Sequence, residues 1–171
     1  DMVVTMTYPG NNSGGSGEKL TYAYTNQGAV KSIWSDLATP GTTSDDYYYL
    51  QQGVYDSAGR TRSLWLGGTY QANQATVQTQ YDYFNWTTQD GLGRLKQITA
   101  GTYTDPDSLA DLRYYSGTDD PAYDVSGNLD NIYRYTNVTT LLETQTFTQD
   151  AMDRLLSAAA TGSASYTETY E

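Results

Sequence analysis

Residues 55–60 read Tyr55-Asp56-Ser57-Ala58-Gly59-Arg60 and contain the chemistry of a tight turn. An Asp at the first turn position can accept a hydrogen bond from the backbone two residues on, and a Gly at the fourth position tolerates a positive φ. This combination predicts a type I turn closed by a left-handed residue, which is typical of β-hairpins. We therefore expect Asp56 and Gly59 to close a hairpin whose returning strand begins near Arg60.

The same kind of turn recurs near residues 25–28, 90–93, 124–127 and 150–153. Its key residues in the later copies are Asp90, Gly93, Arg94, Asp124, Gly127, Asp150 and Arg154. Thr25 replaces the Asp in the first copy and Asp153 replaces the Gly in the last, but both residues are compatible with a turn. Recurrence at intervals within the range of about 20 to 50 residues indicates a repeat protein, in which each unit packs only against its neighbours.

Side chains alternate on both sides of these turns. Before a turn, aromatic residues alternate with small or polar ones, as in residues 20–24, and after it aliphatic residues do so, as in Leu64 and Leu66. A period of two indicates β-strands. The sequence thus predicts an all-β chain of about five antiparallel β-hairpins over residues 1–171. Residues 3–8 and 18–25 should pair in the same way around a Gly- and Ser-rich tip.

The connections between hairpins are polar and variable in length. We expect loops over residues 35–44, 67–75 and 101–122, with a short helix at Ser108–Arg113 in the last of them. Asp105, Asp107 and Asp111 have the spacing of a calcium loop but lack its glycine and its terminal Glu, so we interpret them as a solvated acidic loop. The pairs Asp45-Asp46 and Asp119-Asp120 are interpreted as solvated in the same way.

Composition excludes most familiar catalytic sites. The chain contains neither Cys nor His, which removes disulfides, thiolate metal sites and the most frequent general base. We therefore predict no enzymatic activity, no cofactor and no metal. Nine basic residues against 20 acidic ones give a net charge of −11, which disfavours nucleic acid as a partner. No apolar run approaches the roughly 18 residues that a membrane-spanning helix needs.

The charged residues of the turns have a structural and a functional interpretation. The four turn aspartates at 56, 90, 124 and 150 could form a carboxylate ladder for calcium, but the turn itself already accounts for them. Arg60, Arg94 and Arg154 can pair with the turn Asp of the same or the neighbouring hairpin, since an Arg guanidinium makes bidentate contacts to carboxylates. We favour this structural role over ligand binding.

Aromatic residues replace the scarce aliphatic ones as packing material. The chain has 18 Tyr and 3 Trp, which bury large areas and favour sheets. Sugars also stack on exposed rings, so some of these residues are candidates for glycan contact: Trp34, Tyr47, Tyr48, Tyr49, Trp65 and Trp86. Consecutive tyrosines point to opposite faces of a strand, so at least one of Tyr47–Tyr49 lies on the other face from its neighbours.

With these residues in view, the chain resembles the YD-repeat (Rhs-repeat) family, whose unit reads approximately Tyr-Asp-x-x-Gly-Arg-Leu. Residues 55–60 match this unit up to its Arg, and Thr7-Tyr8-Pro9-Gly10 is similar to an upstream element of the family. Other copies depart from the pattern: Gln89 and Gln149 replace the Tyr, and Ala29 and Asn128 replace the Arg.

The resemblance implies a curved repeat sheet that is a fragment of a spiral β-shell in a large bacterial protein, secreted or at the cell surface. The neighbouring repeats of the same parent chain would be its partners, and the shell would enclose or display a cargo such as a C-terminal toxin domain. The alternative is a carbohydrate-binding or adhesion module. Residues 166–171 repeat the alternation seen before the first turn, so we expect a piece of a longer array whose strand edges could self-associate.

Overall fold

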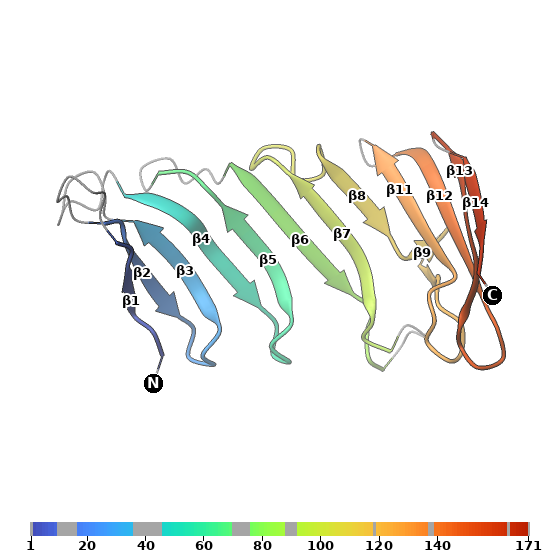
Figure 1. Cartoon of the computed structure of the whole chain (residues 1–171), viewed down its shortest axis with the longest axis horizontal. Coiled ribbons are helices and arrows are strands. Elements are labelled where there is room, and N and C mark those ends of the chain that lie inside the picture. Colours follow the sequence, from blue (N-terminus) through green and yellow to red (C-terminus); the bar gives the residue numbers. More distant parts are fainter. Residues whose placement is uncertain are drawn as a thin grey trace. The chain divides into compact units, whose positions relative to one another are not determined.

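The computed structural model describes residues 2–9, 17–35, 46–69, 76–87, 92–117, 119–136, 139–163 and 165–170, and the regular structure of these residues consists of strands (Figure 1). The chain divides into two compact units. The first comprises residues 1–79 and 102–104, and the second comprises residues 80–101 and 105–171. Strand β6 (Val77–Tyr83) contributes residues to both units.

The first unit is an antiparallel sheet whose strands follow one another in chain order. Its strands are β1 (Thr5–Thr7), β2 (Lys19–Tyr24), β3 (Val30–Ser35), β4 (Tyr47–Tyr55) and β5 (Thr61–Leu66). The pairing of β1 with β2 confirms the hairpin expected from residues 3–8 and 18–25. Ile33 on β3 lies opposite both Tyr22 and Leu50, so aromatic and aliphatic side chains meet across the sheet as the alternation predicts.

The second unit repeats this arrangement. Its main sheet has the order β7, β8, β11, β12, β13, β14, and β9 pairs with β10 separately. The strands span β7 (Leu95–Gly101), β8 (Ala110–Arg113), β9 (Tyr115–Ser116), β10 (Asp120–Pro121), β11 (Asn131–Thr136), β12 (Thr140–Gln149), β13 (Leu155–Gly162) and β14 (Tyr166–Thr169). All described pairings are antiparallel, which confirms the predicted all-β hairpin array within each unit.

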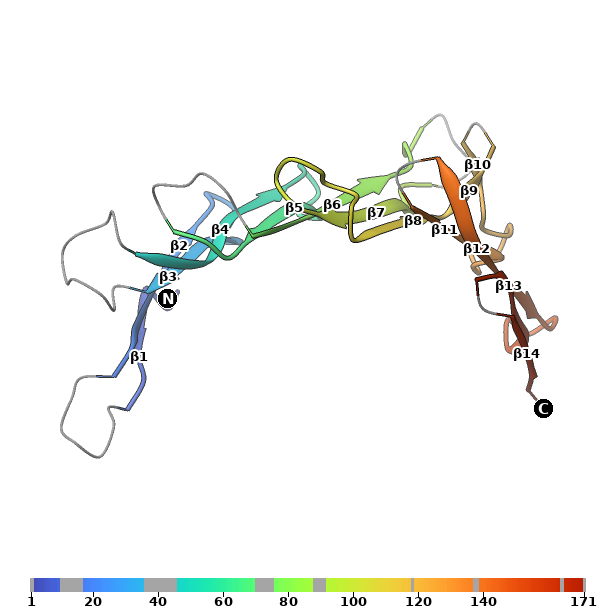
Figure 2. The same ribbon diagram turned by 90° about the horizontal axis from the view of Figure 1, so that it is seen from above.

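The main sheet of each unit is a single layer of strands, seen nearly edge-on in Figure 2. A single layer has no second sheet to cover it, and few large side chains in the described residues are fully enclosed. Phe84 is 1% exposed, whereas Leu20 and Leu50 reach 8%. Stability must therefore come mainly from strand pairing and from side chains that lie across neighbouring strands.

The helix expected at Ser108–Arg113 is wrong. Residues Ala110–Arg113 form β8, which pairs with β7 on one side and β11 on the other. Leu112 lies opposite both Ile98 and Arg134, so pairing on two edges overrides a helical preference that four residues could not sustain. Residues 101–122 are thus only partly a loop. In the described part of the chain, no helix is long and apolar enough to cross a membrane.

Candidate functional site: the tyrosine and aspartate turns

The turn at residues 56–59 is closed by one carboxylate. The Asp56 Oδ1 atom accepts hydrogen bonds from the backbone N–H groups of Ala58 and Arg60, each at 2.9 Å. The backbone N–H of Gly59 donates to the Asp56 carbonyl at 3.0 Å, and Gly59 has a φ of 80°. A positive φ at the fourth position is the geometry that glycine adopts without a steric penalty. The predicted role of Asp56 and Gly59 thus has a direct geometric counterpart.

Two further turns use a carboxylate in the same way. Asp150 Oδ1 accepts from the N–H groups of Met152 and Arg154 at 2.8 and 3.0 Å, and Asp124 Oδ1 accepts from those of Gly127 and Asn128 at 2.7 and 2.8 Å. In the first turn the Thr25 hydroxyl oxygen accepts at the longer distances of 3.2 and 3.3 Å. The hydroxyl is therefore a weaker replacement for the carboxylate.

These hydrogen bonds shift the titration of the turn aspartates. Partial burial raises the pKa of Asp56, but hydrogen bonds from the Arg60 N–H, its guanidinium and the Ala58 N–H outweigh this effect and lower the pKa overall. The Asn128 amide is the main cause of a lowered pKa at Asp124, and the Arg154 N–H is the main cause at Asp150. All three carboxylates are therefore stabilised in the charged form that the turn requires.

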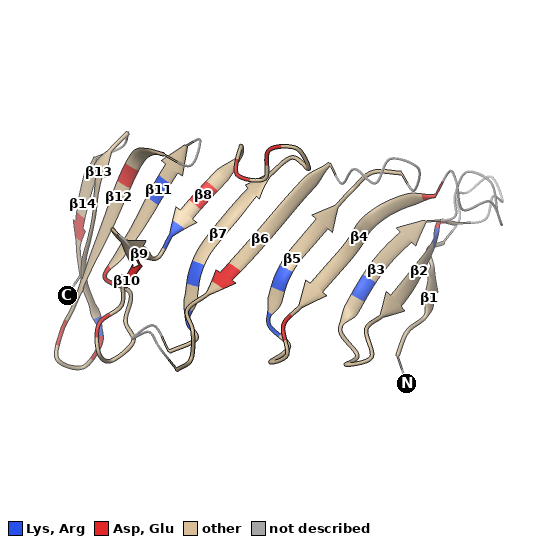
Figure 3. Ribbon diagram, turned by 180° about the vertical axis from the view of Figure 1, so that it is seen from behind, with Lys and Arg blue, Asp and Glu red and all other residues tan. Residues whose placement is uncertain are grey.

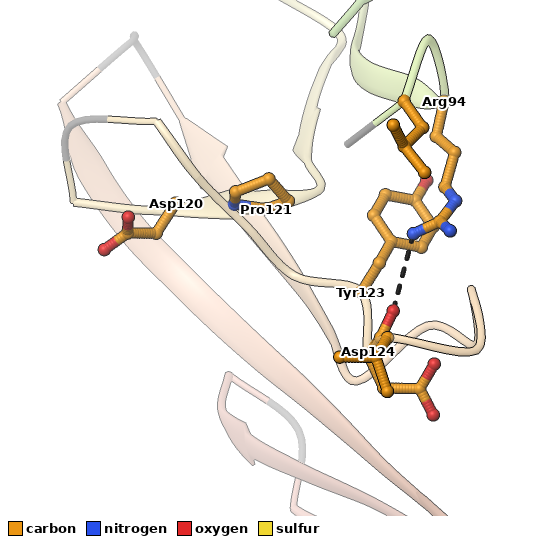
Figure 4. A pocket seen from close by; sticks show the side chains of 7 residues that line it. Arg94, Asp120, Pro121, Tyr123 and Asp124 are labelled. Atoms are coloured by element: carbon orange, nitrogen blue, oxygen red, sulfur yellow. Dashed lines mark hydrogen bonds between the residues drawn. The ribbon is translucent and has the colours of Figure 1, made fainter. Parts of the chain in front are cut away.

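The arginines after the turns do not all behave alike. Arg60 and Arg154 each place Nε 2.7 Å from the Oδ2 atom of the Asp that opens their own turn. Arg94 instead reaches the following turn: its guanidinium lies 5.3 Å from the centre of the Tyr123 ring, and its Nη1 donates to the Asp124 carbonyl at 3.5 Å (Figure 4). The predicted turn residue Asp90 lies outside the described residues.

The third connection is longer than the sequence suggests. The backbone N–H of Phe84 donates to the carbonyl of Arg94, much further along the chain, at 2.9 Å. In the other turns the closing hydrogen bond runs from a backbone N–H to the carbonyl of the residue four positions later. Strand β6 therefore ends at Tyr83, well before the predicted turn at residues 90–93. Gly93 has a φ of 72°, and its position leaves room for the Trp86 ring, which a Cβ at residue 93 would overlap.

A tyrosine hydroxyl at the end of an entering strand joins successive hairpins. We call this contact the tyrosine link. Tyr24 donates to the Val3 carbonyl at 2.6 Å, Tyr55 to that of Val30 at 2.8 Å and Tyr123 to that of Leu95 at 2.9 Å. In the fifth hairpin the Gln149 Nε2 atom donates to the Leu129 carbonyl at 2.9 Å.

Local backbone geometry aims these side chains. A register shift in the strand pairing falls directly before Tyr24, Tyr55 and Gln149, and such β-bulges redirect the side chain that follows. Sequence reasoning assigned the tyrosines to packing and missed the link. The one available signal is chemical: the residue before the turn acid is Tyr or Gln, both of which can donate a hydrogen bond.

The candidate glycan residues lie in separate places. Tyr47 and Tyr49 are about half exposed, and their rings meet edge to face at 5.3 Å. Tyr48 lies on the other face of β4 and stacks on Trp34 at 5.9 Å. Trp65 packs edge-on against Tyr103 at 5.6 Å, and Trp86 is 59% exposed in the other unit. Of the six candidates, the structure brings Tyr47 and Tyr49 together as an exposed pair.

Two acidic residues expected to be solvated are buried. Asp111 is 0% exposed on β8, where the Arg113 guanidinium contacts both of its carboxylate oxygens and Gln97 donates to it at 2.7 Å. The Arg113 guanidinium also lies 3.9 Å from the centre of the Tyr135 ring. Asp46 is 3% exposed. The expectation of solvated side chains was wrong at both positions. At Asp111 the reason is that residues 110–113 form a paired strand.

The remaining charges suggest no metal or anion site among the described residues. Partial burial, together with a hydrogen bond to Asp105, raises the pKa of Asp107, yet no group of three or more acidic side chains in the described ranges could hold a metal ion. Basic residues lie on separate strands, such as Lys31 on β3 and Arg62 on β5 (Figure 3). This spacing creates no concentrated basic surface in the part of the chain that the structure describes.

No protein-family model matches the chain, and no curated protein matches it. Several solved structures are similar to it. A crystal structure of TcdB2-TccC3-TEV has a TM-score of 0.60 at 23% identity, one of TcdB2-TccC3 has 0.60 at 24%, and the Tc holotoxin pore of Photorhabdus luminescens has 0.59 at 22%. Each match covers 91% of this chain but only 7% of the other chain.

At this level of identity the matches establish the fold. The matched toxin components are Rhs-repeat shell proteins, so the resemblance indicated by the turn sequences is confirmed at the level of the fold.

Proposed function

We propose that this chain is a non-catalytic structural segment of a large secreted YD-repeat protein, in which it forms part of the wall of a β-shell. The observation that carries this proposal is the tyrosine link combined with strand order. Within each unit, successive hairpins pair in chain order, and Tyr24, Tyr55 and Tyr123 fasten successive hairpins to one another. Such an array extends by adding hairpins, as repeat proteins do.

A shell wall is also expected to be thin and to have sheet edges to which further strands can be added. The main sheet of each unit is one strand layer thick (Figure 2). Among the described strands, β1 and β14 each pair on one side only. A sheet edge of this kind accepts a further strand, so further repeats of the parent chain are the natural partners.

The cargo and the location of the protein belong to the same proposal. The fold is shared with toxin components, which supports a bacterial, secreted parent chain whose shell encloses a C-terminal toxin domain. Because the chain lacks Cys and His, a passive wall accounts for its composition better than an enzyme does. A single array over residues 1–171 remains part of this proposal.

Protease protection of the parent protein tests enclosure. We expect trypsin to leave the region that follows the repeats uncut in the intact protein. The same region should become sensitive to trypsin in the Gly53→Ala variant. This substitution places a methyl group 2.7 Å from the Val30 carbonyl oxygen and so disturbs a contact between hairpins. Ser57→Ala serves as the control, because Ser57 is an exposed residue in the turn of the same hairpin. Equal cleavage of the intact protein and the Gly53 variant would contradict enclosure.

The carbohydrate-binding alternative rests on Tyr47 and Tyr49. These rings form an exposed pair, and the Tyr49 hydroxyl donates to Glu18 at 2.7 Å, which orients the ring. A glycan array probed with the 171-residue chain and with Tyr47→Ala separates the two functions. Saturable binding that the substitution removes would favour adhesion, whereas absence of binding to every glycan would favour the passive wall.

A further inference from the structure

The space between two successive turns forms a recurring slot in the second unit. In the slot between the third and fourth turns, the Arg94 guanidinium lies over the Tyr123 ring (Figure 4). The same ring meets Phe84 edge to face at 6.4 Å. A cavity of about 430 Å³ remains outside this stack, walled in part by Asp120 and Pro121 of β10. This slot therefore contains an aromatic ring supplied by the chain itself.

The next slot, between the fourth and fifth turns, has no such ring. Asn128 replaces the Arg and Gln149 replaces the Tyr, although the Gln149 amide keeps the hydrogen bond to the preceding hairpin. The residues around the slot line a cavity of about 240 Å³ that is largely open to solvent. Its volume is below the range of about 300–1,000 Å³ that is usual for drug-sized ligands. Its lining consists of Asn128, Leu129, Phe147, Gln149, Asp153 and Leu155.

We propose that the cavity between the fourth and fifth turns is a binding site for a phenolic ring. Leu129, Phe147 and Leu155 supply apolar contact, and Leu155 is 41% exposed although it is a large aliphatic side chain. The half-buried Phe147 ring can make an edge or offset contact with an aromatic ligand. A guest ring would thus occupy the kind of place that Tyr123 occupies in the preceding slot.

The polar side of the cavity favours a hydroxyl on that ring. Asp153 takes the glycine position of its turn with a φ of 61°, and its Oδ1 accepts a hydrogen bond from the Asn128 amide at 2.8 Å. A carboxylate has several acceptor positions, so it can also accept from a phenol O–H, and a bond to a charged acceptor is stronger than a neutral one. The site therefore combines an apolar floor with an anionic acceptor. The inference does not depend on the shell function.

Titration of the isotope-labelled 171-residue chain with p-cresol tests the site. We expect saturable, millimolar binding that shifts the backbone amide signals of Leu129, Phe147 and Asp153. The non-aromatic analogue 4-methylcyclohexanol should bind about two- to tenfold more weakly, because it lacks the aromatic contact. No shift with p-cresol, or equal binding of the two compounds, would overturn the proposal.

Substitutions locate the binding. Gln149→Tyr should fill the slot with the chain's own ring and abolish the p-cresol shifts, while Thr148→Tyr, on the exposed opposite face of β12, should leave them unchanged. Asp153→Gly suits the positive φ and so preserves the fold, and it should weaken binding by removing the acceptor. Undiminished binding in both Gln149→Tyr and Asp153→Gly would overturn the proposal.

The source of the phenol is decided by a second probe. Binding of N-acetyltyrosinamide with the same shifts would identify a tyrosine side chain of a protein as the ligand class. Binding of p-cresol alone would identify a free phenol, because the cavity would then exclude a peptide backbone.

Discussion

Removing one hydroxyl from a tyrosine link should measurably loosen the first unit. In Tyr55→Phe the Val30 carbonyl loses a donor at 2.8 Å in a half-buried position. The net contribution of such a hydrogen bond is about 0.5–1.5 kcal/mol. We therefore expect the free energy of unfolding to fall by about 1 kcal/mol, measured by urea denaturation followed by circular dichroism. Tyr49→Phe is the matched control, since its hydroxyl bonds Glu18 in an exposed position and should matter by less than about 0.5 kcal/mol.

Gly53 provides a second test of the same contact. A Cβ at this position would lie 2.7 Å from the Val30 carbonyl oxygen and 3.0 Å from the Tyr55 hydroxyl oxygen. Gly53→Ala should therefore cost about 1–3 kcal/mol, the usual range for overpacking. Because both substitutions disturb one contact, their effects in the double variant should sum to less than the separate costs. Strict additivity, or a Tyr55→Phe variant as stable as Tyr49→Phe, would refute the reasoning.

Three other predictions use the same unfolding assay. Gly59→Ala should lower the free energy of unfolding by about 1–2 kcal/mol for its positive φ alone. Gly162→Ala should cost more, because its Cβ would also overlap the Leu142 carbonyl oxygen, and equal costs would contradict this. Arg113→Ala should cost about 3–5 kcal/mol because it strands the buried Asp111 carboxylate, against at most about 1 kcal/mol for the exposed Arg154→Ala. The pKa of Asp56 is lower in the folded protein than its unfolded value of about 3.9. Its carboxylate therefore stabilises the fold fully above that unfolded pKa, and this stabilisation is lost as the pH falls through the folded pKa. In Asp56→Asn the urea midpoint should accordingly fall less steeply as the pH is lowered.

Turn chemistry was the most predictable part of the molecule. The hydrogen bonds that close a turn run between residues at most four apart, so Asp56 and Gly59 carry their own geometry in the local sequence. The strands beside them follow from alternation. The connection between β6 and β7 could not be located from turn chemistry alone. Asn85 already accepts a hydrogen bond from the Thr87 N–H at 2.9 Å, and β6 ends at Tyr83, before the Asp90-Gly91 sequence begins.

Contacts between hairpins could not be derived from local sequence. The acceptor of each tyrosine link is a backbone carbonyl, which has no residue signature and is identified only once the strand register is known. The same applies to Asp111, whose carboxylate pattern favours solvent. Formation of β8 places Arg113 on the same face of the strand, and pairing with β7 brings Gln97 to the carboxylate. Local sequence does not explain the glycine at position 53 either. Its lack of a Cβ leaves room for the Tyr55 ring and the Val30 carbonyl oxygen, which approach it only in the folded sheet.

The tyrosine link has a direction. In the described residues its donor belongs to the later hairpin and its acceptor to the earlier one, as Tyr24 reaches Val3 and Tyr123 reaches Leu95. A ribosome delivers the acceptor first, so every new hairpin meets a finished edge as it emerges. The tyrosine links can therefore form in the order of synthesis, because each donor emerges after its acceptor has been made.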